Sequence, residues 1–228
     1  MRRQRIAGLR TCRRIHRSAA IPCREGPRTL PAKNAAGKGL PAYARVNGSA
    51  RGVVIRDMRG VRRIRIEGHP VFVTLVTHGR RPWLAAPGCV PALLNAMRRV
   101  RTMYPFRHLA HVILPDHVHW MFDPMENADF SRIVAATKRE VTWRAKQGAF
   151  ASPPLWQDRF YDHVIRDATD LQRHLDYVHF NPVKHRVATM PIDYAYSSFR
   201  EWVVRGAYSA DWGASKEFPE AIRGMECE

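Results

Sequence analysis

The chain has 228 residues, 45% of them hydrophobic, which is enough for one folded domain with a sizeable core and an additional tail. Its formal net charge is +18, but residues 1–65 hold 18 Lys and Arg against 2 Asp and Glu, so the remainder carries only +2. With no long apolar run and no CxxC pair among four cysteines, a signal peptide, a membrane span, a disulfide framework and a zinc ribbon are excluded. The default location is a reducing cytoplasm.

The basic N-terminal stretch differs from the rest. Residues 1–57 are rich in Arg, Gly, Pro, Ala and Ser without a helical or strand period, so we expect disorder. A nucleic-acid-binding arm, a targeting peptide and a translated leader without function all fit it. The sequence from Met58 runs directly into a strand, which favours Met58 as the true start. We therefore expect a folded domain over residues 58–213 and a C-terminal tail over residues 214–228.

The first elements of the domain follow from composition. Residues 71–77 are dense in β-branched and aromatic side chains and predict a strand. Arg80 and Arg81 stand at its exit, where they either meet phosphates or are simply solvated. Residues 91–103 carry apolar side chains at helical spacing and predict an amphipathic helix.

A histidine-bearing hairpin comes next. Pro115 and Asp116 form a turn between expected strands over residues 109–114 and 117–122. Because side chains alternate along a strand, His117 and His119 point to one face, and the apolar residues among them point to the other. The two imidazoles are close enough to share a metal ion, although two ordinary polar positions would give the same pattern.

The second half predicts a helix over residues 129–146, a strand over 160–165 and a helix that begins after an N-cap at Asp167. That helix should end near residue 180 because Pro182 follows. An aromatic-rich stretch, residues 194–208, predicts a short C-terminal helix. The order of elements predicts an α+β domain with helices on one face of a mainly antiparallel sheet.

On the helix after Asp167, three polar side chains lie on one flank of the apolar stripe. At about 100° per residue, His174, Tyr177 and Asn181 fall within roughly 60° of one another. Tyr177 and Asn181 are thus one turn apart and can face a neighbouring sheet together. A half-buried core tyrosine and a helix-end asparagine remain the alternative interpretation.

If the histidine face of the hairpin packs against the Tyr177 and Asn181 flank of the helix, the residues can perform phosphoryl chemistry. His117, His119 and Asn181 would supply two imidazoles and an amide oxygen to a divalent cation, which suits Mg²⁺ or Mn²⁺, while imidazole also accepts Zn²⁺. An open cation polarises a phosphodiester. The Tyr177 hydroxyl, one turn from a ligand, is positioned as a nucleophile. A phosphotyrosine ester would conserve the bond energy for rejoining the strand.

Several motifs together resemble one family. Residues 114–119 (LPDHVH), 155–160 (LWQDRF), 177–185 (YVHFNPVKH) and 196–199 (YSSF) are similar to the single-tyrosine HUH transposases, specifically the REP-associated tyrosine transposases. The resemblance covers about residues 60–213. One departure is Arg186, where Gly is expected after the Lys-His pair, and it could strain the end of the helix.

The resemblance implies a ferredoxin-like antiparallel sheet with helices packed on it, the HUH endonuclease-type fold. It implies His117, His119 and Asn181 as metal ligands, Mg²⁺ or Mn²⁺ as cofactor and Tyr177 as nucleophile. The implied reaction is cleavage and rejoining of single-stranded DNA next to a hairpin, through a 5′-phosphotyrosine. Further candidate DNA contacts are Trp156, Arg159, Arg166 and Lys184, besides the two arginines at the strand exit. For Trp156, Arg159 and Arg166, a core or surface position is the alternative interpretation.

Two other functions remain open at this point. A metal-dependent hydrolase would use the same histidines to activate water, and a domesticated relative would bind hairpin DNA without cleaving it. The expected partners are single-stranded or hairpin DNA, with no membrane, for a monomer or a homodimer in the bacterial cytoplasm at the nucleoid.

Overall fold

The central unit is a β-α-β-β-α-β arrangement. The computed structural model describes residues 52–56, 62–66, 68–125, 128–148, 151–215, 219–225 and 227. The unit comprises β3 (Val71–Val76), α1 (Cys89–Met103), β4 (Phe106–Ile113), β5 (His117–Pro124), α2 (Phe130–Gly148) and β6 (Tyr161–Val164). All neighbouring strands are antiparallel, in the order β4-β5-β3-β6. This is the predicted ferredoxin-like α+β fold.

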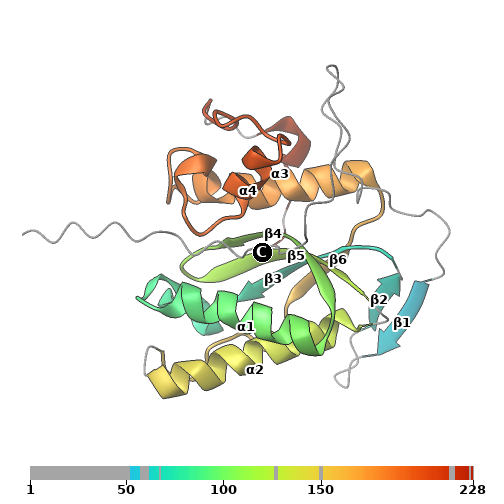
Figure 1. Ribbon diagram of the computed structural model, residues 1–228, viewed down its shortest axis with the longest axis vertical. Helices are drawn as coiled ribbons and strands as arrows, with labels where there is room; N and C mark the ends of the chain where they lie inside the picture. The colour runs from blue at the N-terminus through green and yellow to red at the C-terminus, as the bar shows by residue number, and fades with distance from the viewer. Residues whose placement is uncertain are drawn as a thin grey trace, which may run out of the picture.

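Helices cover both faces of this sheet, not one face as the sequence predicted. Figure 1 shows α1 and α2 on one side and α3 (Ala168–Lys184) with α4 (Phe199–Val204) on the other. Two separate apolar clusters fill the two spaces. The order of elements does not reveal this because α3 follows the last strand and can pack on either face. Its own apolar stripe, with Leu171, Leu175 and Val178, closes the second face.

The remaining elements are short. β1 (Gly52–Arg56) and β2 (Arg62–Ile66) form a separate antiparallel pair. β1 lies inside the stretch expected to be disordered, in a segment rich in β-branched residues; the preceding residues 1–51, and with them most of that prediction, lie outside the described residues. The 3₁₀ helices among the described residues are η2 (His78–Arg80), η3 (Trp83–Ala85), η4 (Pro191–Asp193) and η5 (Glu220–Ile222). In the described part of the chain, no helix is long and apolar enough to cross a membrane.

The helix that carries Tyr177 begins as predicted and ends later than predicted. Asp167 is its N-cap and accepts a hydrogen bond from Asp170 N at 2.8 Å. Pro182 lies inside the last turn and does not stop the helix, which continues to Lys184. A proline removes one backbone donor, and the final turn tolerates this because its last N–H, on His185, still bonds to Asn181 O at 2.9 Å.

The edge strand β4 is covered by the segment that leads into α4. Ile113 N donates to Tyr196 O, and Val112 pairs with Ser197 in a short antiparallel bridge. Ser198 Oγ accepts a hydrogen bond from His111 N and donates to His111 O. The Tyr-Ser-Ser-Phe sequence therefore anchors α4 to the sheet and protects its edge.

The buried imidazoles of His108 and His111, both on β4, are held neutral by their neighbours. Trp120 Nε1–H donates to His108 Nδ1 at 3.1 Å, so the proton of His108 is on Nε2, which donates to His111 Nδ1 at 3.1 Å. Protonation of either ring would bring two N–H groups face to face. Burial and nearby positive charge lower the pKa of His111 to about 4, and burial and His111 lower that of His108 well below its usual value.

The folding stability should therefore fall as pH decreases. The unfolded chain binds protons near the usual histidine pKa of about 6.5, while the folded chain does not. When the pH is lowered from about 7.5 to about 5.5, each of these two imidazoles should reduce the unfolding free energy by about 1.4 kcal/mol. Urea unfolding at several pH values measures this slope. A His108→Gln variant should have a shallower slope, and an equal slope in both proteins would contradict the assignment.

The end of α3 contains the strain that the sequence suggested. Arg186 adopts φ 57°, in the left-handed region where a side chain is unfavourable. We expect Arg186→Gly to raise the unfolding free energy by on the order of 1 kcal/mol, because glycine lacks the Cβ atom that clashes there. Thermal unfolding measures the effect. Arg186→Ala removes the guanidinium but keeps Cβ, so it should give no stabilisation; equal melting temperatures for the two variants would refute the strain.

Candidate metal and nucleophile site

Three of the predicted site residues, His117, His119 and Tyr177, meet between the sheet and α3, and Asn181 lies one helical turn after Tyr177. The period of two along β5 turns Val118, Trp120 and Phe122 into the α1/α2 core and leaves His117 and His119 facing α3. The centroids of these two imidazole rings are 4.8 Å apart, and the His119 ring is 5.1 Å from the Tyr177 ring. His117, His119, Tyr177 and Asn181 are all at most 1% exposed.

Hydrogen bonds fix the orientation and tautomer of His119. Thr74 on the neighbouring strand β3 donates its only hydroxyl proton to Cys227 O. Its oxygen lies 2.9 Å from His119 Nδ1 and must therefore accept a proton from that nitrogen. His119 thus has its proton on Nδ1, and its buried Nε2 atom keeps a lone pair for a ligand.

Asp116 sets the same tautomer on His117. Its Oδ1 atom lies 2.7 Å from His117 Nδ1, and its Oδ2 atom accepts from Arg80 Nη1 at 3.2 Å. Burial alone would raise the pKa of Asp116, but its hydrogen bonds and its attraction to His117 and Arg80 lower it overall. The ionised carboxylate therefore holds the Nδ1 proton and leaves Nε2 of His117 as the ring nitrogen that could bind a metal ion. A carboxylate behind a histidine is typical of metal sites.

Asn181 supplies the observation that favours a third ligand. Its Nδ2 atom donates to Tyr177 O at 3.0 Å, which directs the amide oxygen away from the helix backbone. Among the residues that the structure describes, this buried Oδ1 atom has no hydrogen-bond partner. A buried oxygen without a partner costs free energy, and a cation would satisfy it. Two imidazole nitrogens and one amide oxygen fit a divalent cation.

The phenol of Tyr177 lies among basic and aromatic groups. Lys184 Nζ is 3.1 Å from the phenol oxygen and 5.0 Å from the centre of the ring. The ring of Phe72 packs against the Tyr177 ring at 6.0 Å. His185, for which no catalytic role was predicted, places its ring 4.9 Å from that of His117. The phenol oxygen therefore has a cationic side chain beside it in a largely buried setting.

The other predicted DNA contacts are scattered. Arg81 donates to Ser152 O and Pro154 O, and Arg166 Nε lies 3.3 Å from Asp170 Oδ2. Arg159 is exposed. Trp156 is only 8% exposed and packs edge-on against Trp83, which does not suit a stacking platform. A role in DNA binding stays a prediction for each of them.

A second cluster of possible metal ligands lies earlier on α3. The ligand atoms of His163, Asp170 and His174 all lie within 4.8 Å of one another. Asp170 accepts hydrogen bonds from His163 Nε2 at 2.8 Å and from Arg166 N at 3.0 Å, and these bonds outweigh burial to lower its pKa. The cluster already joins β6 to the first turn of α3, so its atoms are engaged without an ion.

The sequence did not reveal Thr74, Asp116 or this second cluster. Asp116 was assigned to the turn, although its position directly before His117 was the available signal. Thr74 lies 45 residues before His119, and only the strand pairing of β3 with β5 brings the two side chains together. His163 and Asp170 are likewise joined only by the return of the chain from β6 into α3.

Comparisons with known proteins agree on one family. The family model described as transposase IS200-like matches residues 66–181 of this chain. A REP-associated tyrosine transposase of Escherichia coli K12 is 34% identical over 156 residues, covering 68% of this chain and 91% of the relative. A Haemophilus influenzae Rd protein of the same group is 33% identical over 171 residues, covering 70% of this chain and 96% of the relative.

One solved structure shares both fold and sequence. It is a REP-associated tyrosine transposase bound to a REP hairpin, with a TM-score of 0.62 and 31% identity. The match covers 71% of this chain and 94% of the other.

The hydrogen bonds around the two site histidines predict their tautomers. In the metal-free protein, both His117 and His119 should carry the proton on Nδ1, because Asp116 and Thr74 accept it there. Two-bond ¹⁵N–¹H correlation spectra of the imidazoles distinguish the two tautomers. Thr74→Val should disturb the pattern of His119 and leave that of His117 intact. A dominant Nε2–H form of either ring in the unaltered protein would contradict the assignment.

Proposed function

Because the chain belongs to the IS200-like transposase family and its group of REP-associated tyrosine transposases, we propose that it cleaves and rejoins single-stranded DNA through a phosphotyrosine intermediate. The observation that carries the proposal is the contact between the Tyr177 ring and the His119 ring, beside His117. A potential nucleophile and two potential metal ligands thus lie in one buried space. Neither the sheet nor α3 supplies this combination alone.

The cation site would be formed by His117 Nε2, His119 Nε2 and Asn181 Oδ1. A divalent cation bound there would polarise a phosphodiester and neutralise charge that develops during the displacement. The mixed nitrogen and oxygen donors suit Mn²⁺ or Mg²⁺. Asp116 and Thr74 would keep both rings oriented, because each holds the proton on the nitrogen that faces away from the ion.

The nucleophile would be the phenol oxygen of Tyr177. It would form a bond to phosphorus while the bond from phosphorus to the 3′ oxygen breaks, which leaves a free 3′ hydroxyl and the 5′ phosphate on the protein. Attack by a 3′ hydroxyl on this ester would reverse the step and rejoin a strand. The Lys184 ammonium, 3.1 Å from the phenol oxygen, would contact the attacked phosphate at the same time.

Hairpin DNA is the proposed substrate class. The related protein of known structure is bound to a REP hairpin. Arg80 would connect DNA to the site, because it is exposed and also bonds to Asp116, the partner of His117. A phosphate bound by Arg80 would therefore be linked to the proposed metal ligand His117 through the side chain of Asp116.

Substitution of the nucleophile tests the reaction. Tyr177→Phe should abolish a denaturant-stable protein–DNA adduct on single-stranded hairpin DNA with Mn²⁺ or Mg²⁺, because phenylalanine has no hydroxyl to attack phosphorus. Denaturing gel electrophoresis detects the adduct. Tyr196→Phe alters a tyrosine that is 47% exposed and should leave adduct formation unchanged.

Two outcomes would contradict this reaction. Cleavage that persists in Tyr177→Phe would indicate a metal-dependent hydrolase. Hairpin binding without any adduct in the unaltered protein would indicate a non-catalytic DNA-binding relative.

Substitution of the carboxylate behind His117 tests the metal site. Asp116→Asn should weaken Mn²⁺ binding by about 10–100-fold, because the ring loses the partner that fixes its tautomer. Isothermal titration calorimetry on DNA-free protein measures the affinity. Asp193→Asn removes the same charge at an exposed position and should leave the affinity unchanged. Equal Mn²⁺ affinities for the two variants would argue against His117 as a ligand.

A further inference from the structure

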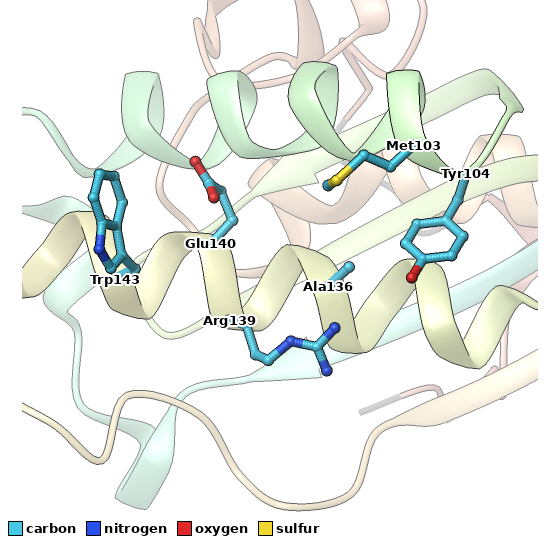
Figure 2. A pocket seen from close by; sticks show the side chains of 6 residues that line it. All are labelled: Met103, Tyr104, Ala136, Arg139, Glu140 and Trp143. Atoms are coloured by element: carbon cyan, nitrogen blue, oxygen red, sulfur yellow. The ribbon is translucent and has the colours of Figure 1, made fainter.

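A groove lies between α1 and α2, on the face of the sheet opposite the histidines. It has a volume of about 250 Å³ and is lined by Met103, Tyr104, Ala136, Arg139, Glu140 and Trp143. Figure 2 shows Trp143 at one end and Met103 with Tyr104 at the other. Trp143 is 57% exposed and Met103 is 54% exposed, so both large apolar side chains are accessible from solvent at the groove. The fold does not need either of them as core.

The two helices that form the groove carry an excess of positive charge. Their sequences hold eight basic residues (Arg98, Arg99, Arg101, Arg132, Lys138, Arg139, Arg144 and Lys146) against one acid, Glu140. That acid is compensated, since its Oε1 atom lies 2.8 Å from Arg144 Nε and 3.7 Å from Arg99 Nε. Arg139 is the cationic side chain that lines the groove itself, and the helices that form the groove carry a net positive charge that favours a polyanion.

We propose that this groove binds a segment of single-stranded DNA, with a base stacked on Trp143 and phosphates near Arg139. Aromatic side chains within a basic groove are the features that single strands require, because unpaired bases expose flat faces that a duplex hides. An uncharged or basic partner surface would not complement the net positive charge of α1 and α2. The exposed indole distinguishes the groove from a merely solvated basic helix face.

The DNA segment proposed to bind this groove is distinct from the DNA segment that would be cleaved at Tyr177. The sheet and its two cores separate the groove from the His117–Tyr177 site, so a strand must pass around the sheet to reach both. The choice of DNA as the polyanion rests on the proposed function. The exposed indole and the basic side chains of α1 and α2 were identified independently of that function. The groove would therefore hold DNA that flanks the cleaved position, and short oligonucleotides should not fill both sites.

Photocrosslinking tests the groove without requiring cleavage. The full-length Tyr177→Phe protein in EDTA is irradiated with single-stranded oligonucleotides that contain 5-iodouracil, and crosslinked peptides are identified by mass spectrometry. At about 0.3 M NaCl, screening weakens contacts made by charge alone. We expect crosslinks at Trp143, and about tenfold weaker binding in fluorescence anisotropy for Trp143→Ala but little change for Trp143→Phe.

Charge variants provide the matched control. Arg139→Gln should reduce crosslinking at Trp143, while Arg223→Gln, the same change at an exposed arginine of the α3 side, should not. The proposal is overturned if crosslinks avoid the groove and Trp143→Ala binds as tightly as Trp143→Phe. It is also overturned if Trp143→Ala abolishes self-association in sedimentation experiments without changing DNA binding, since the groove would then be a protein interface. Crosslinks at Trp143 support the groove even if no adduct ever forms at Tyr177.

Discussion

The alternation of side chains along β5 is the constraint on which the candidate site depends. Val118, Trp120 and Phe122 fill the core under α1 and α2, so the histidines between them must face α3. A shift of this strand by one residue would bury the imidazoles in the apolar core and remove the site. The large apolar side chains therefore stabilise the sheet and also determine which face the two histidines occupy.

The second face of the sheet brings together groups that are far apart in the sequence. Tyr177 and Asn181 come from α3, Thr74 comes from β3, and Asp116 comes from the turn before β5. Each contact has a distinct role: Thr74 and Asp116 orient the rings, and Asn181 presents a buried oxygen. A metal site of the proposed kind needs such support behind each ligand, because an imidazole that is free to rotate would bind a cation less tightly.

The sequence predicted the parts of this arrangement that depend on local periodicity. The hairpin, the common face of His117 and His119, the flank with Tyr177 and Asn181, and the N-cap at Asp167 all follow from spacing over a few residues. It did not predict that α3 covers the opposite face from α1 and α2, because that choice depends on the whole apolar surface of the sheet.

The effect of Pro182 as a helix terminator was overestimated, since a proline has little effect in the last turn of a helix. Thr74 could not be found, because its role exists only through strand pairing. The family resemblance rested on separated motifs, and the family comparisons confirmed it.

The position of a bound cation is the decisive evidence for or against the proposed metal site. Crystals of the full-length protein soaked in Mn²⁺ would give an anomalous difference peak that locates the ion without any assumption about activity. We expect one peak bound by His117, His119 and Asn181, next to the Tyr177 hydroxyl. A peak only at His163, Asp170 and His174, or a Tyr177 oxygen directed away from the ion, would contradict it.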